Sequence, residues 1–239
     1  MMPLDENSLG RTGPLNELHV SPTPPCHDPL PIIYADDDIL VVDKPAGLLS
    51  VPGRIMKDCV LSRVLQAFPQ ARIVHRLDLD TSGVMVLGLS QLAVSDLNRQ
   101  FRERLVVKSY AAEVFGILDQ AQGEISWPIA PDPVNRPRQK IDPEHGKHAI
   151  TEYRLILQGP ESARLALFPL TGRSHQLRLH LAHLGHPILG CDLYAHETAF
   201  QAASRLMLHA EKLGFSHPRT VRPVTFSSPV PFPREASRD

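Results

Sequence analysis

Cysteine is scarce in this sequence of 239 residues: there are three, Cys26, Cys59 and Cys191, and no two of them form a C-x-x-C pair. The sequence therefore gives no disulfide framework, and a reducing cytoplasm is the simplest compartment. Long hydrophobic runs are also missing, since no stretch approaches the roughly 20 apolar residues of a membrane-spanning helix. The opening residues, MMPLDENSLG, are polar and acidic, unlike a signal or transit peptide. We expect no membrane partner.

An excess of charge of one sign is absent as well, because 25 Lys and Arg residues face 26 Asp and Glu residues. Net charge alone therefore argues against a nucleic-acid partner. The charges are unevenly placed, however: residues 1–60 hold four basic and nine acidic side chains, and the rest of the chain holds 21 basic and 17 acidic ones. Basic residues gather at 99–108 and 136–140. These clusters fit either a solvated surface or contact with a polyanion.

The composition, with 42% apolar and 21% charged residues, is that of an ordinary globular protein. The length suits one large domain or two small ones. Residues 1–30 contain six prolines and few large apolar side chains, so we expect a flexible tail there. The folded domain is predicted over residues 31–226, without an internal linker, and a second tail over residues 227–239.

Apolar periodicity predicts more strands than helices. The run over 84–89 is almost continuously apolar, which is typical of a central strand with both faces covered. Helices are predicted over 59–68, 91–104 and 174–184. Further strands are predicted over 32–34, 39–43, 106–115, 125–129, 149–157, 164–168, 207–215 and 221–226. Strands that follow one another as hairpins favour an α+β fold with a mixed, mostly antiparallel sheet.

The most distinctive segment is H-R-L-D-L-D-T-S-G at residues 75–83, directly before the apolar run. Polar side chains at the end of a buried strand are typical of a binding loop on a rigid element. Asp80 is compatible with a simple capped turn. Asp78 differs, because nearby arginines such as Arg76 favour the charged form of a carboxylate. An ionised carboxylate can act as a nucleophile or a base.

Two enzyme classes place an aspartate in such a segment. Phosphotransferases of the haloacid dehalogenase type use D-x-D-x-[TV], and residues 78–82 come close to it. That class has an apolar strand directly before the first aspartate, whereas a histidine and an arginine stand here. The fifth position is Ser82 rather than Thr or Val, and no acidic pair follows a later strand. The second class fits better.

Residues 75–83 match H-R-L-D-x-x-T-S-G, and this motif is similar to the signature of the RluA-type pseudouridine synthases. Other segments resemble the same family in order: K-S-Y-A-A at 108–112, G-R-S-H-Q-L-R-L-H at 172–180, G-H-P-I-L-G at 185–190 and L-H-A at 208–210. The resemblance spans about residues 31–226. It implies a pseudouridine synthase fold with helices flanking the central sheet and an active-site cleft across it. No N-terminal S4 domain is expected, because residues 1–30 are too few and too polar.

The resemblance implies three catalytic residues. Asp78 is the nucleophile, and its attack falls either on C1′ of the ribose or on C6 of the uracil ring, which the sequence leaves open. Arg178 pairs with Asp78 and keeps it charged, as a guanidinium can do with two parallel hydrogen bonds. Tyr110 stacks on the target base, and its hydroxyl is a candidate for proton transfer.

Six further residues are implied in substrate binding. Arg76 is the candidate to occupy the position that the flipped uridine leaves, and Leu177 forms an apolar floor. We expect His175 to be a structural hydrogen-bonding residue, with the loop of Asp78 as its candidate partner. The other three are His75, Thr81 and Arg173.

RNA is the partner that the resemblance implies, in particular the tRNA anticodon stem-loop and 23S ribosomal RNA. Expected targets are uridine 32 of the anticodon loop and uridine 746 of 23S rRNA. The basic clusters would contact the RNA backbone. Because relatives with the same motifs act on different uridines, specificity is expected in loops such as 52–58 and 131–145. No protein partner is implied, and we expect a monomer.

No cofactor and no metal is expected. The sequence has no Gly-rich phosphate loop, and His175, His180, His183 and His186 do not complete a zinc set. One departure from the family pattern is Cys191, where Asp is common; Asp192 is the candidate to take that place. Alternatives are a same-family synthase for another uridine and a non-catalytic RNA-binding protein with this fold.

Overall fold

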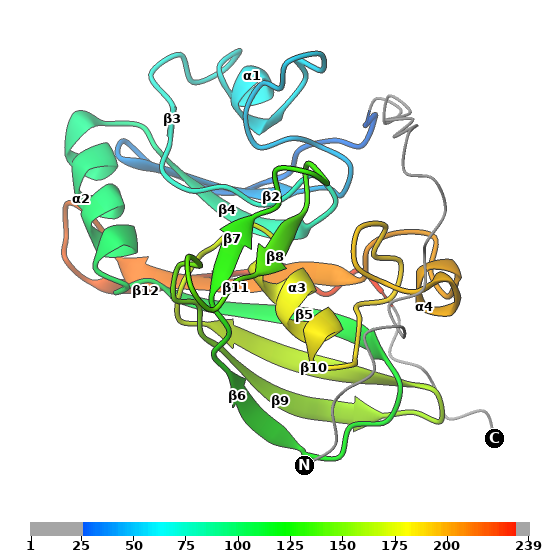
Figure 1. The fold of residues 1–239 in the computed structure, drawn as a ribbon. Helices are drawn as coiled ribbons and strands as arrows, with labels where there is room; N and C mark the ends of the chain where they lie inside the picture. Colours follow the sequence, from blue (N-terminus) through cyan, green and yellow to red (C-terminus); the bar gives the residue numbers. More distant parts are fainter. Residues whose placement is uncertain (1–25, 233–239) are drawn as a thin grey trace.

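The computed structural model describes residues 26–232, and the expected tail over residues 1–25 and 233–239 lies outside this range. Within it, ten strands form one large twisted sheet, and two more form a separate hairpin in front of the middle of that sheet (Figure 1). The order of the main path is β1-β2-β4-β11-β5-β10-β9-β6, with β12 on β11 and β3 on β4. Among the described pairs only β4 and β11 run parallel. The predicted α+β fold with a mostly antiparallel sheet is confirmed.

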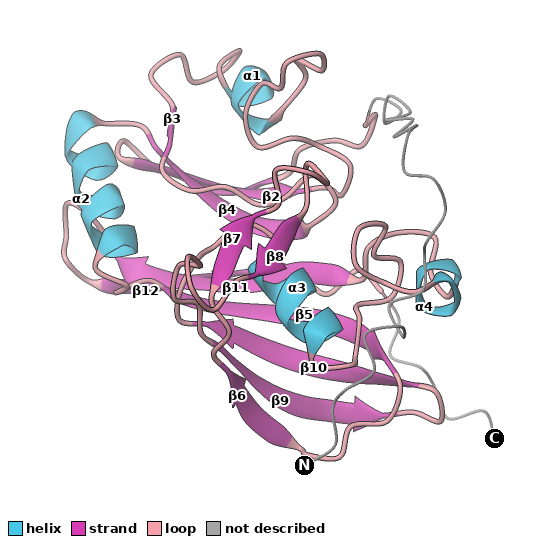
Figure 2. Cartoon of the chain, in the orientation of Figure 1, coloured by secondary structure: helices cyan, strands magenta, loops and turns pink. Residues whose placement is uncertain are grey.

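The strands of the large sheet are β1 (Ile32–Ala35), β2 (Ile39–Lys44), β3 (Arg72–Ile73), β4 (Ser82–Gly88), β5 (Val107–Phe115), β6 (Gln122–Ile125), β9 (Thr151–Gln158), β10 (Ser162–Pro169), β11 (Leu208–Ser216) and β12 (Pro223–Ser227). The hairpin consists of β7 (Ile129–Pro131) and β8 (Gln139–Ile141). Four helices accompany them in the described range: α1 (Val60–Val64), α2 (Gln91–Arg102), α3 (Gln176–His183) and α4 (Glu197–Gln201). Figure 2 shows how small the helical share is.

The apolar run before Leu89 forms β4, and every residue of this strand is buried. Its side chains alternate between two cores. Val84 and Val86 pack with Leu97 of α2, whereas Met85 and Leu87 pack with residues of α1. A third core lies between α3 and the strands β5, β9 and β10. The central strand is therefore covered on both faces, as the pattern predicts.

Several boundaries differ from the prediction. The segment 125–129 is not one strand: β6 ends at Ile125 and pairs with β9, while β7 begins at Ile129 and pairs with β8. Pro128 lies between them and lacks the N–H that a ladder needs. The predicted loop 131–145 therefore contains β8. The predicted helix 174–184 begins only at Gln176, because the preceding residue has a left-handed backbone.

The packed chain extends beyond the predicted domain of 31–226 at both ends. Cys26 and Leu30 pack against the core near α1, and Arg63 donates a hydrogen bond to the carbonyl of Asp28. At the other end, Phe232 is buried, and the hydroxyl of Ser228 donates to a carboxylate oxygen of Asp43 at 2.7 Å. The described parts of both expected tails are thus folded onto the domain.

Candidate active site

A cleft of about 540 Å³ opens where three segments of the chain meet beside β5. These segments are the connection between β3 and β4, the stretch from the end of α2 into β5, and the loop from β10 into α3. All nine residues predicted for the site line this one cleft. They are His75, Arg76, Asp78, Thr81, Tyr110, Arg173, His175, Leu177 and Arg178. Residues about 100 positions apart in the sequence are therefore brought together.

Asp78 lies in the β3–β4 connection and is half-buried. The carbonyl of Asp78 accepts a hydrogen bond from the N–H of Thr81 at 3.2 Å, which closes a turn directly before β4. Among residues 26–232, no hydrogen bond or ion pair engages its side chain. The carboxylate is thus at the cleft wall with its oxygens available to a substrate.

Lys44, which the sequence analysis did not single out, bonds the backbone of the loop that carries Asp78. This ammonium is fully buried and donates to the carbonyls of Pro45, Leu48 and Leu79 at 2.6–2.9 Å. Burial lowers the pKa of Lys44 to about 7, against the opposing effect of Asp80 and Asp78. Position 44 at the end of an apolar strand, followed by proline, is the only sequence feature that could have indicated it.

The structure corrects the prediction that Arg178 pairs with Asp78. Its guanidinium forms an ion pair with Asp192, not with Asp78, and it donates two hydrogen bonds to the sulfur of Cys191. Burial disfavours its charge, but Cys191, Asp192 and Asp78 outweigh this and raise the pKa of Arg178. The charge of Asp78 therefore acts on Arg178 without a direct bond.

Tyr110 lies on β5, between the core near α1 and the core near α3. Burial and the negative charge of Asp78 raise the pKa of Tyr110. Its phenol is consequently neutral at physiological pH. It can donate a proton or a hydrogen bond, and the side chain lines the cleft.

His175 and its neighbours Arg173 and Leu177 also line the cleft. His175 has φ of 56°, a left-handed conformation that is unfavourable for a residue with a Cβ. Its Nδ1 lies 2.8 Å from the hydroxyl of Tyr194, so its partner is not the Asp78 loop as predicted. Arg173 donates to the carbonyl of His148 at 3.1 Å, and Leu177 is buried in the core near α3.

Arg76 and Thr81 lie on the same loop but differ in exposure. Arg76 is exposed at the rim of the cleft, and Thr81 is buried. The exposed guanidinium can therefore reach a partner that the cleft admits.

The rim of the cleft also carries positive charge from Arg102, Arg104 and Lys108. Lys108 donates to the carbonyl of Thr171 at 3.1 Å, which links β5 to the loop before α3. Burial, with a smaller effect of Arg104, lowers the pKa of Lys108 to about 8. In the sequence these residues were part of a basic cluster, and nothing distinguished those that face the cleft.

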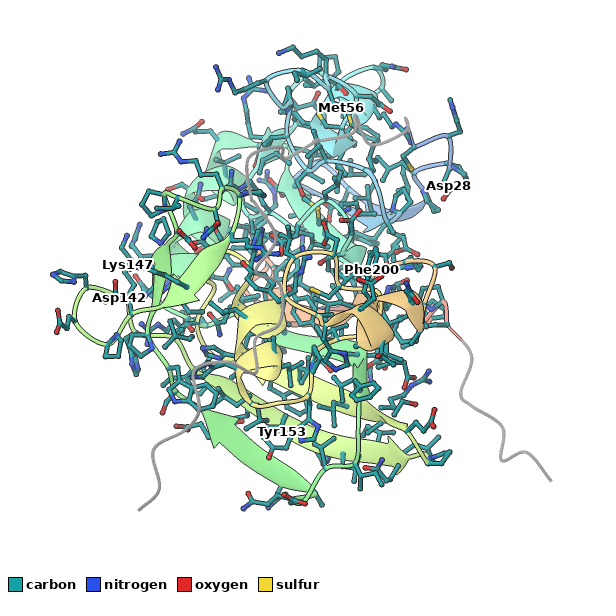
Figure 3. The ribbon with its side chains drawn as sticks, turned by 45° about the vertical axis from the view of Figure 1, so that its right-hand side comes forward. Asp28, Met56, Asp142, Lys147, Tyr153 and Phe200 are labelled. Carbon is teal, nitrogen blue, oxygen red and sulfur yellow. The ribbon has the colours of Figure 1, made fainter. Side chains whose placement is uncertain are left out.

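Figure 3 shows Asp142 and Lys147, which follow β8 in the chain, at the outer margin of the molecule.

His75 is held in its neutral form. Its Nε2 accepts a hydrogen bond from the N–H of Val86 at 3.1 Å, and its ring stacks on Phe101 with centroids 4.6 Å apart. Burial, with a smaller effect of Lys108, lowers the pKa of His75 to about 3. A protonated ring could not accept this hydrogen bond.

The low pKa of His75 predicts acid sensitivity. The unfolded chain binds a proton near pH 6.5 and the folded chain only near pH 3, so stability from this group is present above pH 6.5 and decreases as the pH falls toward 3. Between pH 7 and pH 4 the free energy of unfolding of the wild type is expected to decrease. For the His75→Gln variant we expect this decrease to be smaller by roughly 1 to 3 kcal/mol. Urea unfolding at both pH values measures this. The exposed His145 is the control, and an equal effect of His145→Gln would contradict the assignment.

No group of three or more His, Cys, Asp or Glu side chains in residues 26–232 is arranged to hold a metal ion. The histidines near α3 have other partners: His180 contacts Thr151 and the carbonyl of Trp127, and His186 contacts the carbonyl of Phe115. Within the same range, no helix combines the length and apolarity needed to cross a membrane.

Comparisons with known proteins agree with this geometry. The family model for RNA pseudouridylate synthase matches residues 38–183. The dual-specificity RNA pseudouridine synthase RluA of Escherichia coli (strain K12) is 49% identical over 212 residues, which are 87% of this chain and 97% of that protein. RluA of Yersinia pestis is 50% identical over 204 residues, or 84% of this chain and 99% of that protein.

Solved structures give the same result. Human RNA pseudouridylate synthase domain containing 1 superposes with a TM-score of 0.75 and 30% identity, covering 87% of this chain and 86% of that one. Human RNA pseudouridylate synthase domain containing 4 shares the fold, with a TM-score of 0.68, 24% identity and coverage of 84% and 88%. The phosphotransferase alternative for residues 78–82 is therefore wrong. The chain belongs to the RNA pseudouridylate synthase family and is an RNA pseudouridine synthase.

Proposed function

We propose that this enzyme isomerises a uridine of the tRNA anticodon loop and a uridine of 23S ribosomal RNA. The extent of identity to the dual-specificity synthases supports two RNA substrates. The observation that carries the chemistry is the Asp78 carboxylate, which has no side-chain partner among the described residues and lines the same cleft as Tyr110 and Arg178. The enzyme works in the cytoplasm as a monomer.

In the proposed reaction Asp78 is the nucleophile. It attacks C1′ of the ribose or C6 of the uracil, and the N1–C1′ bond breaks. The base then turns so that C5 bonds C1′, the bond to Asp78 breaks, C5 loses its proton and N1 gains one. Arg178 and Tyr110 line the same cleft as Asp78, and the charge of Asp78 contributes to raising the pKa of both. Arg178 stabilises negative charge, and the neutral Tyr110 stacks on the base and can transfer a proton.

The target uridine must leave its stack to enter the cleft, and this costs a few kcal/mol. Arg76 is exposed at the rim, where its guanidinium can occupy the vacated position and bond the partner base or a phosphate. Leu177 gives the extracted base an apolar floor. His75, Thr81, Arg173 and His175 shape the remaining wall. The basic residues at 99–108 and 136–140 contact the RNA backbone, so affinity falls as salt rises.

The substrates are tested with purified protein and two transcripts labelled with tritium at uridine C5, a tRNA and a 23S rRNA fragment. We expect tritium release from both, with one site in each identified by pseudouridine mapping. Transcripts in which the mapped uridine is replaced by cytidine are the control. Release from only one RNA class would overturn the dual specificity, and release from neither would favour the non-catalytic RNA-binding alternative.

A further inference from the structure

Three residues of one short loop surround the guanidinium of Arg178. Its Nε and Nη2 both lie 3.3 Å from the sulfur of Cys191, and Nη2 also bonds a carboxylate oxygen of Asp192. The ring of Tyr194 lies against the guanidinium carbon, 5.6 Å from centroid to carbon. The Arg178 side chain is 4% exposed, so these contacts define its position.

The counter-ion of Arg178 is divided between two side chains. A planar guanidinium presents its Nε–Nη2 edge as a fork that matches a carboxylate with two parallel hydrogen bonds. In this chain the sulfur of Cys191 stands before that fork, and sulfur is a weak acceptor. The full negative charge comes from Asp192, which reaches Nη2 alone and whose own side chain is 53% exposed.

This arrangement leaves the other end of the guanidinium available. Among residues 26–232, no hydrogen bond engages Nη1 of Arg178. The loop that grips Arg178 is itself fixed, because the hydroxyl of Tyr194 lies 2.8 Å from both His175 Nδ1 and the N–H of Gln139 on β8. Arg178 is thus held along one edge while Nη1 remains free for Asp78 or the substrate.

We propose that Cys191 and Asp192 are positioning residues for Arg178. The sulfur sets the direction of the Nε–Nη2 edge, and the carboxylate of Asp192 neutralises the buried charge so that Arg178 does not collapse onto Asp78 before substrate binds. This inference rests on the proposed function, because Arg178 acts only beside a nucleophilic Asp78. It adds two residues that do not line the cleft.

The test removes the carboxylate at position 192 and then places one at position 191. Asp192→Asn is expected to lower kcat about 10- to 100-fold with KM changed less than about threefold, because the guanidinium loses its fixed position. Adding Cys191→Asp to that variant places a carboxylate before Nε and Nη2, the two nitrogens that the sulfur contacts, and is expected to restore most of kcat. Cys191→Asn in the same background is the matched control and is expected to restore none. Asp119→Asn, an exposed carboxylate after β5, is expected to leave kcat unchanged.

A rescue by Cys191→Asn equal to that by Cys191→Asp, or an unchanged kcat in Asp192→Asn, would overturn the proposal. A second measurement does not depend on activity. Asp192→Asn is expected to lower the urea midpoint of unfolding in the wild-type chain but not in an Arg178→Met background, because the ion pair is already lost there. An equal decrease of the urea midpoint in both backgrounds would overturn the proposed role of Asp192, whether or not the enzyme is active on the RNA tested. Failure of this proposal and failure of the proposed function are therefore distinguishable.

Discussion

Replacing Asp78 with asparagine is expected to reduce pseudouridine formation by roughly 1,000-fold or more, as is usual when a nucleophile is removed. The amide has nearly the same shape but carries no charge and cannot attack C1′ or C6. Since no side-chain hydrogen bond of Asp78 is present among the described residues, the exchange breaks no contact that holds the loop. Tritium release from uridine C5 under single-turnover conditions measures the effect, because the C5 proton is lost when C5 bonds C1′.

Asp80, two residues further on, is the matched control for this experiment. It does not line the cleft, and burial together with the charge of Asp192 raises its pKa. We expect Asp80→Asn to lower the rate less than about tenfold. If both variants lost activity to the same extent, the loop as a whole and not the Asp78 carboxylate would be required. If Asp78→Asn kept wild-type activity, the nucleophile would have to be another group.

Much of the site could be predicted because short motifs fix it locally. The segment 75–83 ends in a buried apolar strand, and this pattern placed Asp78 at the end of a rigid element. The motif around Arg178 lies at the start of a helix, as expected. Both motifs line one cleft, although periodicity alone says nothing about which distant segments meet.

Other features depend on tertiary contacts that no local pattern carries. A lysine is normally exposed to solvent, so the sequence did not predict that Lys44 is buried and donates to three carbonyls. Likewise, the pairing of Arg178 with Asp192 depends on how the loop after α3 folds back. Two strands were misjudged for a related reason: β7 and β8 are three residues each, too short to show a period of two.

The junction between the Asp78 loop and β4 is expected to tolerate no side chain at Gly83. This residue has φ of 116°, and an added Cβ would lie 2.2 Å from the carbonyl oxygen of Ala210 and 2.7 Å from its backbone carbon and nitrogen. The obstacle is the backbone of β11, which pairs with β4 on one side and β5 on the other, so no side chain can rotate away. Either β4 or β11 must shift.

We expect Gly83→Ala to lower the free energy of unfolding by about 3 kcal/mol or more, measured by urea denaturation. The folded remainder is expected to lose about 100-fold in rate, because a displacement of about 1 Å at Ser82 and Gly83 carries Asp78 away from Tyr110 and Arg178. Gly47→Ala is the control: Gly47 also has a positive φ, of 76°, but a Cβ there meets no atom within 4 Å. Its expected loss is about 1 kcal/mol, from backbone strain alone. Equal losses in the two variants would show that strain, and not the contact with β11, limits position 83.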